Sequence, residues 1–332
     1  RVELRKRPLR FDGLGLSLLV IVMVSWEVML SKGQEWDWLG DPFWRVQMLA
    51  IFFVFGLIAL ISWELRHPSP VVNFRPLRER NFAACCVIIF GAFAVLYAAS
   101  TSLPALLQSL FGYDALSAGL VMSPAGFGAL VAMPFVGRAL GKGADARWLL
   151  AAGLLIMAVA NYWMSQMNLD ISPGQVVWPR VMLVFGLSMC FAPANVAAYL
   201  YIPPALRGAA VGLLSLLRNE GGSVGTSMAQ TIQERRDQFH TLRLGESLDS
   251  FNANVASFLH RAGEVFLQQS GDPSAAQQFA WQSLDNLRQQ QASSLAYFDV
   301  FFILAVVTLV LAPIVLLMKR SVAEKGAHIG AE

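Results

Sequence analysis

The sequence has 332 residues, of which 56% are apolar and only 14% are charged, and its formal net charge is +3. A soluble domain carries about 25% charged residues, whereas the apolar residues here come in blocks of about 20, the length that crosses a hydrocarbon layer about 30 Å thick. This composition excludes an ordinary soluble domain. It predicts an all-α polytopic membrane protein whose main partner is the lipid bilayer, with no nucleic acid involved.

Residue types that carry covalent chemistry are sparse. Cys85, Cys86 and Cys190 lie inside apolar blocks, and no C-x-x-C spacing occurs. The four histidines are scattered, and the sequence contains no G-x-x-x-x-G-K-[ST] phosphate loop. We therefore expect no metal site, no cofactor, no ATP hydrolysis and no enzymatic function.

The chain begins with a basic segment, residues 1–12, which we place in the cytoplasm. It has no initiating methionine and no signal peptide, as expected for a piece of a longer chain. Residues 13–64 then contain two membrane spans, roughly Gly13–Leu30 and Arg45–Glu64. Glu27 lies in the outer third of the first span, where it either reaches the outer surface beside Lys32 or has a function inside the membrane.

A basic loop, residues 65–82, leads to five more spans within residues 83–232. These are roughly Ala83–Gln108, Ala115–Ala139, Trp148–Met167, Val176–Ile202 and Ala209–Ile232. Pro124 and Pro134 predict that the fourth span bends, because proline removes a backbone hydrogen bond. Arg180 lies one turn inside the outer end of the sixth span, where it either extends outward to water or serves a function.

The seventh span combines three kinds of surface. With 100° per residue, three glycines fall within about 60° of Arg218 and would let another helix approach closely. They are Gly221, Gly222 and Gly225. A polar stripe at about 80–140° from Arg218 consists of Asn219, Ser223, Thr226 and Gln230. Glu220 points about 160° away from Arg218, so the two charges are not expected to neutralise each other.

The cost of burying these groups indicates a polar environment. A large aliphatic residue contributes about −0.3 to −0.6 kcal/mol to insertion, and a central arginine or acid costs about 2.5 to 3.5 kcal/mol. We therefore expect the polar stripe to line a substrate cavity with Arg218 beside it. Three roles stay open for Arg218. It is a structural or gating group bonded to carbonyls or to a carboxylate of another helix, it contacts the substrate or lies on the proton path, or it lies at the membrane interface. Tyr97 and Ser100 of the third span are further candidates for the cavity wall.

Residues 233–295 are polar, with apolar residues at helical spacing, and predict short amphipathic helices outside the membrane. They form either a self-packed cap or a docking surface for a partner. The last span, residues 296–318, precedes a tail, residues 319–332. With both ends of the chain in the cytoplasm, the inner segments hold sixteen Lys and Arg and the short outer connections hold two, which is the distribution that membrane proteins favour.

Four stretches carry a resemblance to a known family. They are LSKGQEWDWLG (Leu30–Gly40), SWELRHPSPVVNFRPLRERNF (Ser62–Phe82), GYDALSAGLVMSPAGFGALVAMPFVGRALGKGADARW (Gly112–Trp148) and LLRNEGGSVGTSMAQTIQERR (Leu216–Arg236). The sequence resembles the EmrB/QacA-type drug:proton antiporters, which are fourteen-span major facilitator proteins. The resemblance implies that these eight spans are the second part of such a fold. Residues 13–64 would be its extra helix pair and the later spans its C-terminal half, while the six-helix N-terminal half and its proton-carrying acids are missing.

The resemblance also implies an inner-loop motif in GRALGKGADAR. Its parts are Gly137, Arg138, Gly141, Lys142 and Arg147. The acid that usually follows Gly-Arg closely is absent, and Asp145 comes later.

For function, the resemblance implies proton-driven efflux of small amphiphilic compounds across the bacterial inner membrane by alternating access. A periplasmic adaptor protein and an outer-membrane channel would be its partners. Two alternatives stay open. One is a major facilitator exporter or importer of a specific metabolite, and the other is a membrane scaffold or enzyme with a catalytic outer segment.

Overall fold

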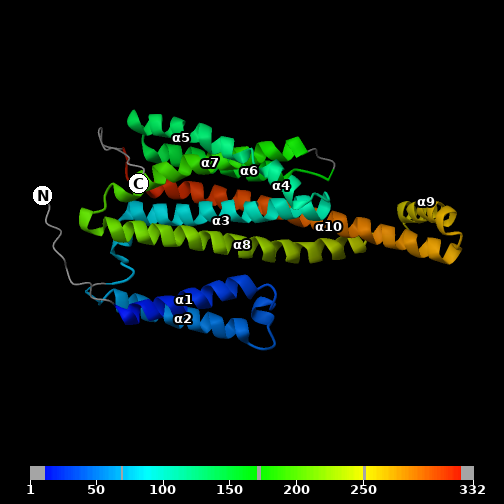
Figure 1. Cartoon of the computed structure of the whole chain (residues 1–332), viewed down its shortest axis with the longest axis horizontal. Coiled ribbons are helices and arrows are strands. Elements are labelled where there is room, and N and C mark those ends of the chain that lie inside the picture. The colour runs from blue at the N-terminus through cyan, green and yellow to red at the C-terminus, as the bar shows by residue number, and fades with distance from the viewer. Residues whose placement is uncertain (1–11, 69, 170–172, 250–251, 323–332) are drawn as a thin grey trace.

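The computed structural model describes residues 12–68, 70–169, 173–249 and 252–322. Throughout these ranges the chain is helical, and the only β-type pairing is an isolated bridge between Asp145 and Val322. The predicted all-α class is therefore confirmed (Figure 1).

The α-helices follow one another along the chain with short connections. They are α1 (Gly13–Lys32), α2 (Arg45–Glu64), α3 (Arg80–Leu110), α4 (Ala115–Met122), α5 (Ala125–Gly141), α6 (Ala146–Ser165), α7 (Pro173–Tyr199), α8 (Arg207–Gly245), α9 (Ala253–Ser270) and α10 (Pro273–Leu311). The 3₁₀ turns are η1 (Trp38–Gly40), η2 (Arg75–Arg78), η3 (Pro204–Leu206) and η4 (Ala312–Leu317). Several helices start at an Asp or Asn whose side chain accepts a backbone N–H, as Asp12 does from Gly15 at 2.9 Å.

In the described residues, seven helical stretches are long and apolar enough to cross a membrane: α1, α2, α3, α4 together with α5, α6, α7, and α10 with η4. Our seventh span, within α8, does not reach this apolarity because it contains Arg218, Asn219 and Glu220. It nevertheless packs along α3 and α10 (Figure 1). The polytopic helical class is therefore clear, and the count of eight spans remains a prediction that depends on α8.

The fourth span is interrupted near its middle. α4 ends at Met122 and α5 begins at Ala125, with Pro124 between them. The predicted bend therefore occurs at the first proline, while Pro134 lies inside α5 without ending it. The missing N–H of Pro124 explains the break, because it removes one backbone hydrogen bond of the helix.

The outer segment differs from the separate short helices that we predicted. α8 continues past residue 232 to Gly245, and α10 begins at Pro273, well before residue 296. No glycine or proline interrupts the sequence from Ser274 to Ala312, so the amphipathic and apolar parts form one helix. At 1.5 Å per residue, the 39 residues of α10 extend about 58 Å, nearly twice the hydrocarbon thickness. The ends of α8 and α10 therefore project as an outer arm that carries α9 (Figure 1).

The arm is joined to the bundle by polar contacts between α8 and α10. Ser293 Oγ donates to Asp237 Oδ1 at 2.6 Å. Six residues further along α10, Asp299 Oδ2 lies 3.1 Å from Arg236 Nε and 2.7 Å from His240 Nε2. These contacts hold the two long helices together where they leave the bundle.

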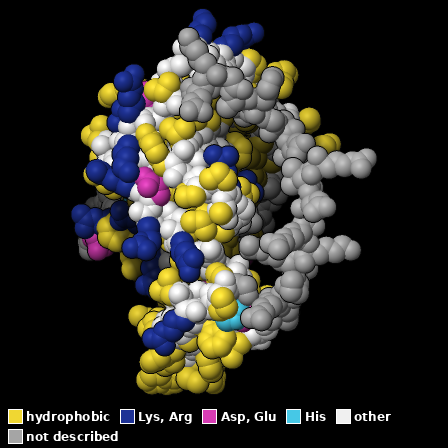
Figure 2. Space-filling model, turned by 90° about the vertical axis from the view of Figure 1, so that its left-hand side faces the viewer, with side chains coloured by type: hydrophobic (Ala, Val, Ile, Leu, Met, Phe, Trp, Pro, Cys, Tyr) yellow, Lys and Arg dark blue, Asp and Glu magenta, His cyan; other side chains and the backbone are white. Residues whose placement is uncertain are grey.

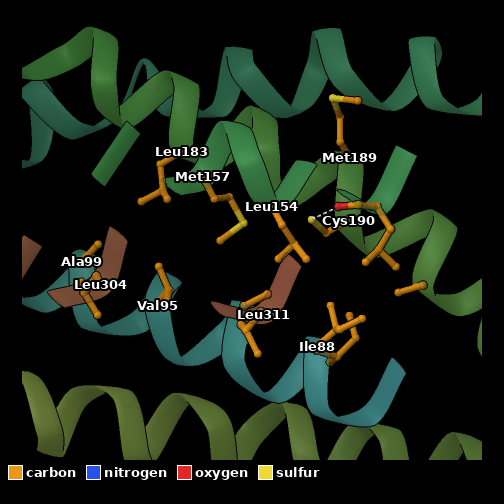
Figure 3. Close-up of a cluster of buried hydrophobic side chains, with 14 of the residues drawn as sticks. Ile88, Val95, Ala99, Leu154, Met157, Leu183, Met189, Cys190, Leu304 and Leu311 are labelled. Atoms are coloured by element: carbon orange, nitrogen blue, oxygen red, sulfur yellow. Dashed lines mark hydrogen bonds between the residues drawn. The ribbon is translucent and has the colours of Figure 1, made fainter. Parts of the chain in front are cut away.

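The core lies where α3, α6, α7 and α10 meet. Figure 3 shows Val95 of α3, Met157 of α6, Leu183 of α7 and Leu304 of α10 converging there. Large apolar side chains on α1, α2 and α5 instead point outward; Val20 is 52% exposed, and Phe55 and Phe127 are each 68% exposed. A helix bundle in lipid requires a closely packed interior and an apolar outer surface, and this structure has both.

Three elements hold the segment after η4 at the end of the bundle where α3 and α8 begin, which we call the inner end. Asn81 of α3 is fully buried, accepts from the Lys319 backbone N–H at 2.7 Å and donates to Ser321 Oγ at 2.9 Å. The Ala146 N–H at the start of α6 donates to the Ser321 carbonyl at 2.9 Å. The Tyr201 hydroxyl, after α7, donates to the Arg320 carbonyl at 2.6 Å. The chain after the last span therefore closes the inner end of the helix bundle.

Candidate functional site

An open cavity of about 530 Å³ lies where α1, α3 and α8 meet. Polar side chains of α8 form most of its wall. The lining residues are Glu27, Leu30, Ser31, Tyr97, Asn219, Gly222, Ser223, Thr226, Ser227 and Gln230. The structure thus brings the whole predicted polar stripe of α8 together with Tyr97, while Arg218 and Ser100 lie outside this wall.

A row of hydrogen bonds connects α8 to α1 along one side of the cavity. Ser223 Oγ donates to Glu27 Oε1 at 2.8 Å, and Ser227 Oγ donates to the Leu30 carbonyl at 2.7 Å. One turn further out on α8, Thr231 Oγ1 accepts from Nε1 of Trp38, which belongs to η1 beyond the end of α1, at 3.2 Å. These α8 residues are four apart and therefore share one face of the helix. We call this row the α1–α8 seam. Glu27 accordingly faces α8, and Lys32, the residue that we expected beside it, pairs with Glu35.

The three predicted close-packing glycines face α3. A Cβ atom at Gly225 would fall 2.6 Å from the carbonyl carbon of Ala94, and one at Gly221 would fall 3.0 Å from that of Phe90. At Gly222 it would meet the Tyr97 ring at 3.0 Å. Each glycine therefore permits an approach between α8 and α3 that a larger residue would prevent.

The two charges of the seventh span point to different neighbours. The Arg218 guanidinium carbon lies 5.6 Å from the centroid of the Phe93 ring on α3, a cation–π distance. Within the described ranges no ion pair involves Arg218, so the carboxylate partner among our expectations is not found there. Glu220 faces α1, where its carboxylate interacts with the Trp26 indole and with the charge of Glu27.

A second cavity of about 470 Å³ continues the polar surface toward the outer end of the bundle. It shares Ser31 and Gln230 with the first cavity. Its other lining residues are Gln34, Glu35, Thr101, Ser102, Ala105, Ala229, Gln233, Glu234 and Tyr297. A continuous polar surface therefore leads from the middle of α8 to the outer end of α1 and to Glu234 of α8.

Comparison with known proteins identifies this architecture. The sequence pattern of the Major Facilitator Superfamily matches residues 13–226. The chain belongs to the major facilitator superfamily. This membership places it among membrane transporters and not among enzymes.

Relatives define the branch within the superfamily. The multidrug export protein EmrB of Escherichia coli strain K12 is 32% identical over 286 residues, which cover 85% of this chain and 55% of that protein. The probable multidrug resistance protein EmrY of the same strain is 28% identical over 98% of this chain and 61% of its own length. The fatty acid resistance protein FarB of Neisseria gonorrhoeae is 29% identical over 93% of this chain and 59% of its own length. This major facilitator chain is therefore of the EmrB type and spans somewhat more than half the length of these relatives.

In this major facilitator chain Arg180 is directed inward, not toward water. It is only 7% exposed, and its Nη2 donates to Ser100 Oγ on α3 at 2.6 Å. Its Nε and Nη1 are buried with no hydrogen-bond partner among the described residues. The alternative in which Arg180 extends outward is therefore wrong in this structure, and Ser100 serves Arg180 and not the polar wall of α8.

The parts of the inner-loop motif separate into two groups. Arg138 and Lys142 are exposed at the end of α5, and Gly137 and Gly141 have open space around them. Arg147 instead contacts Asp145 (Nη2 to Oδ2, 2.7 Å) and donates from Nη1 to the Met318 carbonyl at 3.0 Å.

Asp145 is the acid that contacts Arg147 of this motif. Burial alone would raise the pKa of Asp145, but hydrogen bonds from Arg147 and from the Ser321 backbone bring it below its ordinary value. The carboxylate is therefore kept ionised, and it ties the start of α6 to the chain that follows η4.

The described residues contain no group of three or more His, Cys, Asp or Glu arranged to hold a metal. Cys85, Cys86 and Cys190 are free and buried.

Sequence reasoning missed the α1 side of the cavity. Ser31 and Ser227 belong to it, and Thr231 lies one turn further out on the same face of α8. The available signal was the four-residue spacing that continues outward from Ser223. At 100° per residue Ser227, Glu220 and Thr231 lie at about 180–220° from Arg218, beyond the stripe that we considered. This arc is the one that faces α1.

Proposed function

We propose that this chain forms the second part of a fourteen-span transporter that exports small amphiphilic compounds by alternating access, driven by protons. The observation that carries this proposal is the polar cavity between α1, α3 and α8, where Asn219, Thr226 and Gln230 are kept in a helix that must lie in the bundle. Such groups at membrane depth are costly and mark pathways for cargo or ions. The names of the relatives, which refer to export of several drugs and to fatty acid resistance, support amphiphilic cargo.

We place the inner end of the bundle in the cytoplasm of a bacterial inner membrane. Figure 2 views the end at which α3 and α8 begin, and Lys and Arg side chains gather over it with few Asp or Glu among them. The basic residues at this end include Arg80 at the start of α3, Arg207 at the start of α8 and Lys142 directly after α5. An excess of basic residues favours the cytoplasmic side.

We assign the outer arm to a partner protein in the periplasm, an adaptor that leads to an outer-membrane channel. Apolar side chains are exposed along the arm, including Leu242 at 72% and Val265 at 53%. Exposed apolar surface beyond the membrane marks a contact site for another protein. Removal of α9 would then abolish export without abolishing membrane insertion.

Accumulation of dyes in cells that express the complete gene product containing this chain tests the proposal. We expect lower accumulation of several chemically unrelated amphiphilic dyes than in control cells, and an uncoupler should remove the difference. Thr226→Val and Gln230→Leu should reduce export because they make the cavity wall apolar. Met228→Leu is the matched control, since Met228 is 52% exposed on another face of the same helix.

Three results would distinguish proton-driven drug export from the alternative functions. Equal accumulation in expressing and control cells for cationic, anionic and neutral dyes would refute drug export. Transport of one metabolite only would identify a specific exporter or importer. Export that persists with the uncoupler would remove the proton from the mechanism.

A further inference from the structure

Arg180 is a buried cation whose charge is not compensated within the described residues. It is 7% exposed, and a single hydrogen bond to Ser100 Oγ at 2.6 Å satisfies Nη2. Its Nε and Nη1 are buried without a partner, and no Asp or Glu of the described ranges forms an ion pair with it. Because arginine stays protonated in proteins, and because a buried charge without a partner is strongly unfavourable, this position requires an anion.

The contrast with Arg218 shows that this state is not general for arginines in the bundle. Arg218 is half-buried, and its guanidinium lies over the Phe93 ring. Arg147 is held by a carboxylate and a carbonyl. Arg180 alone among these three has neither an aromatic face nor an acceptor with negative charge.

Ser100 places the guanidinium next to a space that a ligand can enter. The Ser100 hydroxyl donates to the Leu96 carbonyl at 2.7 Å, so the oxygen that accepts from Arg180 is fixed in direction. Ser100 also lines an open cavity of about 660 Å³ that continues along α3 past Thr101 and Gln108. The guanidinium therefore lies one side chain behind the wall of this cavity.

The backbone of α7 can change direction next to Arg180. Pro179 precedes Arg180 in α7 and removes one backbone hydrogen bond of the helix. A helix can bend at such a position. A bend at this point would change the position of the Arg180 side chain relative to the cavity wall that Ser100 forms.

We propose that Arg180, positioned by Ser100, binds the carboxylate of an acidic amphiphilic compound as it passes through the transporter. A planar carboxylate accepts two N–H groups of a guanidinium in parallel, which matches the donors that Arg180 leaves free. The inference rests on the proposed export function and names a class of its cargo. The same carboxylate chemistry could come from an Asp or Glu elsewhere in the complete protein, and the experiment separates the two sources.

The test uses the complete gene product and three probes with one apolar body: pyrenebutyrate, pyrenebutanol and a pyrenebutyl trimethylammonium. Equilibrium binding to the purified protein is measured in detergent, and transport of each probe is measured separately in proteoliposomes. We expect Arg180→Gln to weaken binding of the acid by at least about tenfold, because hydrogen bonds to charged groups contribute about 1.5–3 kcal/mol. Binding of the alcohol and the cation should be unchanged.

Two milder variants and a control keep the test decisive if Arg180→Gln does not fold. Arg180→Lys keeps the charge but loses the fork of donors, so acid binding should fall by less than in Arg180→Gln. Ser100→Ala should weaken acid binding without affecting the other probes. Arg207→Gln, at an exposed arginine at the start of α8, should change nothing.

A loss that is equal for all three probes, or a loss of thermal stability in the milder variants without selective loss of the acid, would assign Arg180 to an ion pair inside the protein and overturn the proposal. Unchanged acid binding in all Arg180 variants would also overturn it. If the wild-type protein transports none of the probes, the export function fails, while the binding measurement still decides the role of Arg180.

Discussion

Substitution of Gly225 by alanine tests whether close packing of α3 on α8 holds the bundle together. The added Cβ would lie 2.6 Å from the carbonyl carbon and from the Cα of Ala94, whereas carbon atoms in contact lie about 3.5–4.0 Å apart. The two helices must therefore separate locally by about 1 Å. A gap of 0.5–1 Å forfeits about a quarter to a half of the dispersion energy of the contacts that it opens, and overpacking of this kind costs about 1–3 kcal/mol.

The expected result is a fall in the melting temperature of the purified complete protein by about 1–4 °C, with reduced transport, because 1 kcal/mol shifts the melting of a chain of 150–250 residues by about 2–4 °C and that of a longer chain by less. Gly212→Ala is the matched control on the same helix, since a Cβ there meets nothing within 4 Å. In an exposed helix position this change should stabilise by about 0.5–1 kcal/mol. Equal melting temperatures of the two variants, with equal transport, would refute the packing argument.

Three further predictions concern single polar side chains. Arg218→Ala should impair transport while leaving expression measurable, and wild-type transport rates in proteoliposomes would contradict this. Asn81→Ala should lower the free energy of unfolding by about 1–3 kcal/mol, because it leaves its buried hydrogen-bond partners unsatisfied. Limited proteolysis should then cut the chain more readily after η4. Asn73→Ala, in an exposed turn, should not change the cleavage. Hydrogen bonds from the Arg45 side chain lower the pKa of Asp41 to about 2 from an ordinary 3.8, so its contribution to stability is complete above about pH 4 and is lost as the pH falls toward 2. Asp41→Asn should therefore lower the melting temperature at pH 7 and do so less at pH 3, and an equal loss at both pH values would contradict this.

The parts of the fold that follow from local physics could be predicted from the sequence. Blocks of apolar residues predict α1, α2, α3, α6 and α7 because each must satisfy its backbone inside lipid. Pro124 predicts the interruption between α4 and α5. The stripes of α8 could also be assigned, since the angle between side chains depends only on the helix period.

The parts that depend on partners far away in the chain could not be predicted. Helical periodicity places Glu27 on a face of α1, but it cannot show that this face meets Ser223, which is 196 residues away in the sequence. For Arg180, the sequence leaves an outward and an inward position equally open, and only the contact with Ser100 decides between them. The continuous α10 was missed because we separated it at a change from polar to apolar residues, although a change in polarity does not end a helix.

Two neighbouring helices and one cavity accommodate the polar side chains of α8, and this distribution explains why the extra helix pair stays with the bundle. Arg218 turns to Phe93 on α3, Glu220 and Ser223 turn to α1, and Asn219 lines the cavity between them. If α1 were removed, Ser223, Ser227 and Glu220 would lose their neighbours and face lipid, where each unsatisfied polar group costs several kcal/mol. The α1–α8 seam therefore makes insertion of α8 depend on α1, a helix that lies almost two hundred residues earlier in the chain. By the same reasoning Glu27→Leu should destabilise α8 more than it destabilises α1, because α1 is apolar enough to cross the membrane alone and α8 is not.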